Sequence, residues 1–185
     1  MSPVRLTRQE NQVSSSVMSA DDVRRAITRI AHEILERQQG PAQLAIVGLQ
    51  RGGAWLAEAI IDALHQIEPN GAVPLGYLDV SMHRDDIGLR PVVPGAISRI
   101  DFPVDGATVV LVDDVLYTGR TVRAAMEGIN TYGRPRSIQL AVLVDRGHRE
   151  LPIRPDYVGK NLPTHLADDV RATRDGVVVS RGAAS

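Results

Sequence analysis

Two adjacent carboxylates and a threonine-rich turn follow the most apolar stretch of the chain. Asp113 and Asp114 come directly after four aliphatic residues, and the turn Thr118-Gly119-Arg120-Thr121 follows them closely. Such an aliphatic run is typical of a buried parallel strand, and open α/β sheets bind ligands at the carboxyl ends of their strands. The turn offers backbone N–H groups, hydroxyls and a helix N-terminus to a phosphate. Because carboxylates would repel that phosphate, we expect them to meet sugar hydroxyls, a divalent cation or a cationic transition state.

This segment resembles the phosphoribosyl-pyrophosphate (PRPP) signature of type I phosphoribosyltransferases. Further segments narrow the resemblance to those members that are uracil phosphoribosyltransferases and also regulate pyrimidine operons; these segments are residues 24–33, 139–153 and 157–164. The resemblance extends from about residue 20 to about residue 180. The signature alone indicates only the superfamily. A second motif is far more specific for these regulatory members: residues 145–153, Asp-Arg-Gly-His-Arg-Glu-Leu-Pro-Ile.

The resemblance assigns roles to the residues around the signature. It implies that Asp113 and Asp114 hold the ribose hydroxyls and favour the oxocarbenium-like transition state. It also implies that the turn holds the 5′-phosphate, with Gly119 allowing close approach of the backbone. The predicted contacts to PRPP or UMP are Gln50, Arg51, Gly52, Val109, Val110, Leu111, Val112, Asp113, Asp114, Val115, Leu116, Tyr117, Thr118, Gly119, Arg120 and Thr121. A surface acidic pair followed by an ordinary capped turn is the structural alternative.

Two arginines are expected to meet the pyrophosphate of PRPP. Arg51 lies in a Gln-Arg-Gly-Gly turn that resembles the pyrophosphate loop, although related proteins frequently have Thr-Arg-Gly, so this arginine is displaced by one position. Arg84 lies in the aperiodic segment 83–106, in which the loop near His83-Arg84-Asp85-Asp86 resembles the flexible hood that closes over the active site. Closure excludes water from the ribosyl cation, and Arg84, counted with the two aspartates as catalytic, would neutralise the leaving group. A structural turn and a solvated charge run are the alternatives.

The loop after the next predicted strand is expected to contact the base. It comprises Asp145, Arg146, Gly147 and His148, and follows an apolar run at 138–144. Parallel strands place their carboxyl ends at one sheet edge, so this loop should lie beside the PRPP turn. The resemblance implies that it reads uracil largely through backbone groups. We do not assign His148 to acid or base catalysis, because a histidine beside an arginine more often binds or supports structure.

Basic residues outside the pocket form a predicted RNA-binding surface. Part of the set shares the polar face of the first predicted helix, and the rest follows the base loop; the members are Arg25, Thr28, Arg29, His32, His148, Arg149, Arg154 and Lys160. From the pattern alone, a solvated charged face tempered by acidic neighbours is the alternative. The resemblance implies that these residues bind pyrimidine-operon messenger RNA, recognising a folded hairpin and its unpaired bases.

Composition limits the classes of protein that this chain can belong to. The chain has 185 residues, which suits one domain with a sizeable core. A net charge of -1 excludes a globally basic nucleic-acid binder but allows a local basic patch. The absence of cysteine excludes disulfides and cysteine-ligated metals. Lacking an apolar run of membrane-spanning length or a signal-peptide core, the protein is expected to be cytoplasmic, without a membrane partner.

Apolar periodicity predicts an α/β fold. We expect a mobile leader at 1–18 and one domain at 19–185, with helices at 19–39, 54–66 and from the PRPP turn to about 133. Strands are predicted at 44–49, 73–80, 109–112 and 138–144, and shorter ones at 153–158 and 177–179. Alternation of strand and helix favours a mostly parallel sheet flanked by helices. With the resemblance, the expectation is a type I phosphoribosyltransferase fold with a flexible hood loop.

The expected function has two parts. The first is conversion of uracil and PRPP to UMP and pyrophosphate, with Mg²⁺ held mainly through PRPP and no dedicated protein metal site. The second, implied by the resemblance, is binding of the pyr mRNA leader under control of UMP or UTP, to attenuate transcription or block translation. The resemblance also implies a homodimer or higher oligomer. A nucleobase salvage enzyme without RNA binding, and a regulator that keeps the pocket only as a nucleotide sensor, are the alternatives.

Overall fold

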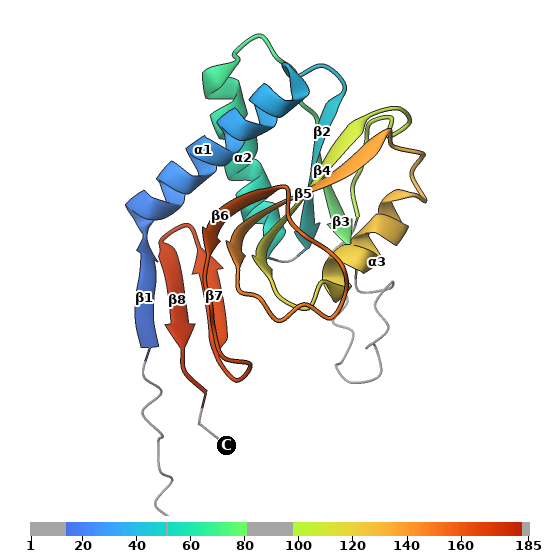
Figure 1. The fold of residues 1–185 in the computed structure, drawn as a ribbon. Helices are drawn as coiled ribbons and strands as arrows, with labels where there is room; N and C mark the ends of the chain where they lie inside the picture. The colour runs from blue at the N-terminus through green and yellow to red at the C-terminus, as the bar shows by residue number, and fades with distance from the viewer. Residues whose placement is uncertain (1–13, 51, 81–97, 183–185) are drawn as a thin grey trace, which may run out of the picture.

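The computed structural model describes residues 14–50, 52–80 and 98–182. Within them the centre of the protein is a five-stranded, all-parallel sheet (Figure 1). Its strands, in spatial order, are β3 (Leu75–Asp79), β2 (Leu44–Gln50), β4 (Thr108–Leu116), β5 (Ser137–Asp145) and β6 (Tyr157–Asn161). The predicted fold class, a mostly parallel sheet flanked by helices, is confirmed.

Helices cover both faces of this sheet, which explains the largely apolar central strands β2, β4 and β5. On one face α1 (Ala20–Gln38) and α2 (Gly53–Ile67) pack against alternate strand residues such as Ile46 and Val110. On the other face α3 (Arg120–Ile129) packs against the intervening residues, such as Leu111. Strand β4 lies in the middle and is buried from both sides over residues 108–113. The core therefore fixes the position of the carboxylates that follow it.

The order of the strands reverses between β2 and β4. The chain leaves β2 for β3 on one side, whereas β4 is followed by β5 and β6 on the other side. Such a reversal leaves a crevice at the carboxyl ends of the two diverging strands, where open α/β sheets bind their ligands. The turn after Gln50 and the segment from Asp113 onward both lie at this point. The topology thus brings two predicted site segments together.

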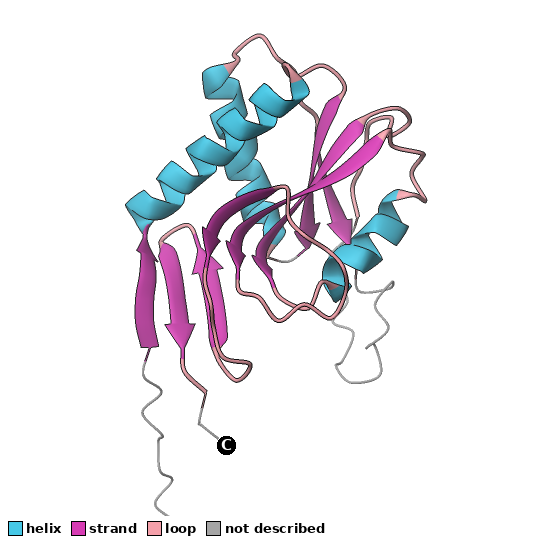
Figure 2. Cartoon of the chain, viewed as in Figure 1, coloured by secondary structure: helices cyan, strands magenta, loops and turns pink. Residues whose placement is uncertain are grey.

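A second, smaller sheet lies beside the central one and joins the two ends of the described chain (Figure 2). Its antiparallel order is β1 (Ser14–Ser19), β8 (Gly176–Ser180) and β7 (Asp169–Thr173). The structure differs here from the expected mobile leader, because residues 14–18 form most of β1. Their serines give no strand pattern; pairing with β8, far along the chain, makes them a strand. The rest of that leader, residues 1–13, lies outside the described residues.

Other boundaries also differ from expectation. Strand β3 is shorter than the predicted 73–80, α3 ends before 133, and β6 begins at Tyr157 rather than near 153. The expected hood, near residues 83–86, lies within 81–97 and so outside the described residues. Where the chain returns, the backbones of Arg99 and Tyr77 exchange hydrogen bonds of 2.7 and 2.8 Å. The described chain therefore resumes beside β3.

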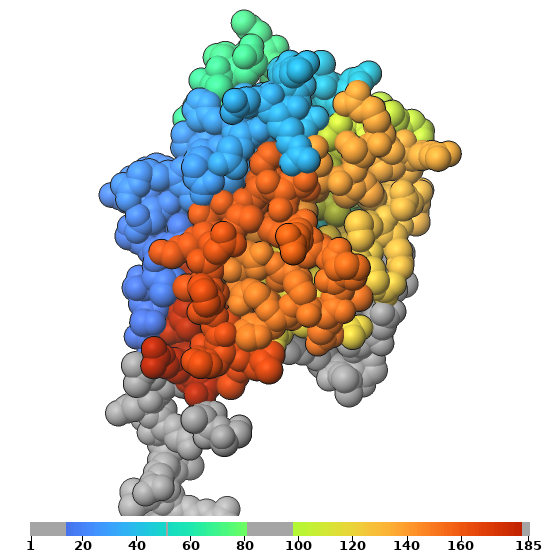
Figure 3. Space-filling model, in the orientation of Figure 1, coloured from blue at the N-terminus to red at the C-terminus, as the bar shows by residue number. Residues whose placement is uncertain are grey.

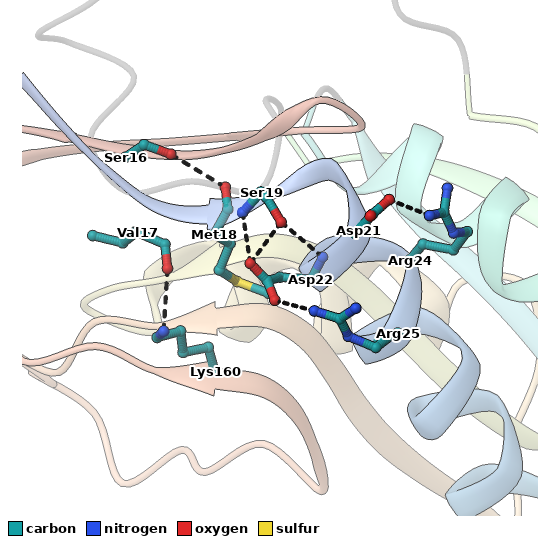
Figure 4. A network of polar contacts seen from close by, with 9 residues as sticks. All are labelled: Ser16, Val17, Met18, Ser19, Asp21, Asp22, Arg24, Arg25 and Lys160. Atoms are coloured by element: carbon teal, nitrogen blue, oxygen red, sulfur yellow. Dashed lines mark hydrogen bonds and ion pairs between the residues drawn. The ribbon is translucent and has the colours of Figure 1, made fainter.

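The first turn of α1 is fixed by a reciprocal cap that should make stability depend on pH (Figure 4). The amide of Asp22 donates to Ser19 Oγ at 3.2 Å, and the Ser19 amide donates to Asp22 Oδ2 at 2.9 Å. These hydrogen bonds, with the Arg25 guanidinium, lower the pKa of Asp22 from 3.8 to about 2. Because the folded pKa is depressed, the stabilisation is complete above about pH 4 and is lost as pH falls toward 2.

We therefore expect Asp22→Asn to lower the free energy of unfolding at pH 6 and to flatten its decline below pH 4. Urea unfolding between pH 6 and pH 3 measures both effects. Asp21→Asn is the matched control, because Asp21 lies in the same turn and pairs with Arg24 but takes no part in the cap. An unchanged decline in Asp22→Asn would contradict the assignment.

Candidate active site

Two glycines let the N-terminus of α2 press against the end of β4. A Cβ atom on Gly53 would lie 2.0 Å from the Val112 carbonyl oxygen, and one on Gly52 would lie 2.3 Å from Asp114 Oδ1. Real Cβ atoms do not approach so closely, so only glycine allows this packing. The pyrophosphate-loop turn and the carboxylate pair are consequently in contact. Of the predicted residues in this turn, Gln50 ends β2, whereas Arg51 lies outside the described residues.

The two carboxylates are held in fixed orientations at the end of β4. Asp113 is only 8 % exposed, and its Oδ1 accepts from the Asp114 amide at 3.0 Å. Asp114 Oδ1 accepts from the Val115 amide at 2.8 Å. Burial raises the pKa of Asp114, and the amide hydrogen bonds oppose that shift. The pair therefore presents preoriented oxygens in a poorly solvated place, which suits hydroxyl binding and a developing cation.

The turn after β4 is shaped to expose helix amides. Gly119 is the N-cap of α3 and has a φ of 92°, a left-handed conformation that glycine adopts without strain. Thr118 Oγ1 accepts from the Arg120 amide at 3.4 Å. The first amides of α3 have no partners within the helix and can bind an anion. The Arg120 side chain instead pairs with Glu150 at 2.7 Å on the surface. The backbone amides and hydroxyls of this turn are therefore the groups available to bind the expected phosphate.

The predicted base loop folds back onto residues 117–121, the turn after β4, which is called the phosphate turn below (Figure 2). Arg149 pairs with Asp145 and donates to the Tyr117 carbonyl at 2.7 Å and the Ile153 carbonyl at 3.1 Å. The Glu150 amide donates to the Thr118 carbonyl at 3.0 Å. Neighbouring parallel strands therefore deliver both loops to one place, as the sequence predicts. Arg149, expected at the RNA surface, is largely occupied in joining these loops.

A segment without a predicted site role supports the base loop from behind. In residues 162–168, the Thr164 carbonyl lies 2.7 Å from His148 Nε2. The His165 carbonyl accepts from Arg146 Nη2 at 2.9 Å. Leu166, in the same segment, is 69 % exposed. No periodicity marks this segment, and the resemblance at 157–164 is the only sequence signal that touches it.

Several residues of the predicted RNA surface are tied into the fold. Arg29 donates to the Val158 and Gly159 carbonyls at 2.9 and 2.8 Å, Lys160 donates to the Val17 carbonyl at 3.1 Å, and Arg25 pairs with Asp22 (Figure 4). In the space-filling view, the blue surface of α1 borders the orange surface around β6 (Figure 3). These contacts place Arg29 and Lys160, one from each predicted basic cluster, on neighbouring parts of the surface.

Three residues of the predicted RNA-binding surface are exposed and make few polar contacts with the rest of the described chain. Thr28 is exposed, and its hydroxyl donates to the Arg24 carbonyl at 3.1 Å. His32 and Arg154 are exposed, and neither side chain has a polar partner within the part of the chain that the structure describes. His32 and Arg154 are therefore the members most open to a ligand.

Some expectations fall outside what the structure describes. Arg84 belongs to residues 81–97 and has no described position. Among residues 14–50, 52–80 and 98–182, no group of three or more His, Asp or Glu side chains is arranged to hold a metal ion. In the same residues, no helix is both long and apolar enough to cross a membrane.

Comparison with known proteins agrees with this geometry. Residues 16–173 match the phosphoribosyl transferase domain family. The chain is 54% identical over 178 residues to the Bifunctional protein PyrR of Roseiflexus sp. (strain RS-1), covering 91% of this chain and 96% of that protein. It is 50% identical over 173 residues to the protein of the same name from Streptomyces coelicolor, covering 90% of this chain and 88% of that protein.

Solved structures show the same fold at low sequence identity. A hypoxanthine phosphoribosyltransferase of Trypanosoma cruzi is similar with a TM-score of 0.70 and 21% identity, covering 94% of each chain. A hypoxanthine phosphoribosyltransferase of Staphylococcus aureus has a TM-score of 0.64 and 18% identity, covering 88% of this chain and 85% of that one. With the sequence matches, these structures confirm the resemblance first drawn from the signature. The chain belongs to the phosphoribosyltransferase family and, within it, to the PyrR proteins.

Proposed function

We propose that the crevice between β2 and β4 binds PRPP and transfers its phosphoribosyl group to uracil, giving UMP and pyrophosphate. One observation carries the proposal: the Asp113–Asp114 pair, the glycine turn before α2 and the N-terminus of α3 meet at the reversal of the strand order. An anion-binding helix end beside a fixed carboxylate pair matches a phosphorylated sugar that becomes cationic as its leaving group departs.

Each part of the crevice has a distinct task in this reaction. The α3 amides and the hydroxyls of Thr118 and Thr121 hold the 5′-phosphate, while the turn at Gly52 faces the pyrophosphate. Asp113 and Asp114 hold the ribose hydroxyls and favour positive charge on the ring. Mg²⁺ would be held mainly through the oxygens of PRPP and would offset the negative charge of the departing pyrophosphate. The loop at 145–148 contacts uracil.

The direct test is pyrophosphate release from PRPP by the full chain, with uracil, hypoxanthine or no base. We expect release that depends on uracil and yields UMP in equal amount. Release with hypoxanthine but not uracil would assign a different salvage activity. UMP binding without any turnover would make the pocket a nucleotide sensor, as in the alternative regulator.

The second proposed function is regulation of pyrimidine genes by binding the pyr mRNA leader, in the cytoplasm, by a homodimer or larger assembly. The support is that α1 contacts β6 through Arg29, and that His32 on α1 and Arg154 in the loop before β6 are both exposed. Surface cations contact RNA phosphates, and a local basic patch suffices in a chain of net charge -1. Nucleotide control follows from position, because residues 145–154 lead from the pocket to this surface and binding linkage is reciprocal.

We expect His32→Ala with Arg154→Ala to weaken binding of a pyr leader RNA about tenfold or more and to reduce its salt dependence. Gel shifts with and without UMP, at two salt concentrations, measure both effects. Arg134→Ala is the matched control, because Arg134 is an exposed arginine just before β5 that does not belong to the predicted RNA-binding set. Binding like that of the wild type by the double variant would overturn the surface assignment.

A further inference from the structure

Arg146 differs from every other basic residue in the described part of the chain because it is buried. Its exposed fraction is 6 %, and no described carboxylate lies within ion-pair distance of it. The adjacent ion pairs involve other residues, Arg149 with Asp145 and Arg120 with Glu150. Burying a guanidinium without a counter-charge is costly unless its donors and its charge are met in another way. The position therefore needs a specific explanation.

The contacts of Arg146 join three segments of the site. Its guanidinium carbon lies 4.2 Å from the centroid of the Tyr117 ring, in the phosphate turn. Its Nε donates to Thr164 Oγ1 at 3.2 Å, and its Nη2 donates to the His165 carbonyl at 2.9 Å. Its own amide donates to the Leu116 carbonyl at 3.1 Å. One side chain thus contacts the phosphate turn and the segment behind the base loop.

Tyr117 is held from a second direction by the same loop. The His148 ring meets it edge to face, with centroids 5.9 Å apart, while His148 Nε2 lies 2.7 Å from the Thr164 carbonyl. A guanidinium stacked on an aromatic ring is stabilised most when both are shielded from water. Nη1 has no partner in the described residues, so the stack on Tyr117 is the main compensation for the charge of this buried guanidinium.

We propose that Arg146 is a positioning residue that sets the affinity for uracil. By stacking on Tyr117 and holding residues 164 and 165, it makes the phosphate turn and the base loop one rigid wall of the pocket. If the phosphate turn and the base loop moved separately, uracil binding would have to order both, and the entropy cost would lower the affinity. The inference rests on the proposed function, since it assigns the base site of that reaction.

The test compares steady-state constants of the full-length enzyme. Arg146→Met keeps the volume but loses the charge and the donors, and is expected to raise KM for uracil about tenfold. The kcat and KM for PRPP should change by less than about threefold, because the phosphate and ribose contacts remain. Tyr117→Leu should likewise raise KM for uracil, and Tyr117→Phe, which keeps the ring, should raise that KM much less.

A double-mutant cycle distinguishes positioning from general damage. If the stack is the cause, Arg146→Met with Tyr117→Leu should be no worse for uracil than the more affected single variant. Additive losses in the double variant would overturn the inference. So would an unchanged KM for uracil in Arg146→Met, or equal increases of its KM values for uracil and PRPP. Arg134→Met controls for loss of an arginine, because Arg134 lies just before β5 whereas Arg146 directly follows it. If Arg146→Met fails to fold, by circular dichroism, Tyr117→Leu alone decides by its uracil KM. A wild-type enzyme inactive with uracil would refute the proposed function itself.

Discussion

Replacing both Asp113 and Asp114 by asparagine is expected to lower kcat/KM for UMP synthesis by about 10³-fold or more. Asparagine keeps the size and some hydrogen bonding, so the change removes mainly the two negative charges. Those charges oppose the positive charge that develops on the ribose as pyrophosphate leaves. The barrier should therefore rise more than the KM for PRPP, and kcat should carry most of the loss.

The measurement is uracil-dependent pyrophosphate release, with the melting temperature of each variant recorded beside it. Neutral amides cost less to bury than carboxylates, so we expect the double variant to stay folded. Asp175→Asn is the control, since Asp175 is an exposed carboxylate in the turn between β7 and β8. Turnover at the wild-type rate would refute the ribose assignment.

Gly53→Ala is expected to damage folding and catalysis together. Its Cβ would lie 2.0 Å from the Val112 carbonyl oxygen and 2.9 Å from the Asp113 Cα, both atoms of the backbone of β4. Because no flexible side chain can yield, α2 must move away from the sheet, at a cost of about 3 kcal/mol or more. The same movement displaces the Gly52 turn from Asp114, and a shift of about 1 Å lowers kcat/KM by about 10²-fold.

Urea unfolding and the uracil assay, run on the same preparation, check both effects. Gly106→Ala is the control: its Cβ meets nothing within 4 Å, so its cost is limited to strain from the positive φ of 71°. A Gly53→Ala protein with normal stability and activity would show that the close packing of α2 on β4 is not required.

The central sheet was predictable because burial on both faces leaves a plain sequence signal. Strands β2, β4 and β5 are almost continuous aliphatic runs, and the helices between them carry apolar stripes. In the small sheet only β8, predicted at 177–179, gives such a signal. Strands β1 and β7 are largely polar, with Ser14–Ser16 and Asp169 exposed, and they become strands only by pairing with β8.

The site was predictable where chemistry and local structure coincide. Asp113, Asp114 and the Thr-Gly-Arg-Thr turn lie in one short segment, so their proximity follows from sequence order alone. Long-range contacts were not accessible in this way. The attachment of Arg29 to Val158 and Gly159 spans some 130 residues, and the burial of Arg146 depends on Tyr117 and Thr164 from two other segments. Residue type alone does not distinguish an arginine that ties the fold from one that awaits a ligand.

The pairing of β1 with β8 has a consequence for how the protein is made. Ser14 and Ser180 are 166 residues apart, yet their hydroxyls lie 3.1 Å from each other. During synthesis β1 leaves the ribosome before the other strands, but β8 appears only after the whole of the central sheet. The five-stranded sheet ends at Asn161 and can form beforehand, whereas β1 must wait with its backbone unpaired. The finished small sheet therefore marks a chain whose translation has passed residue 180.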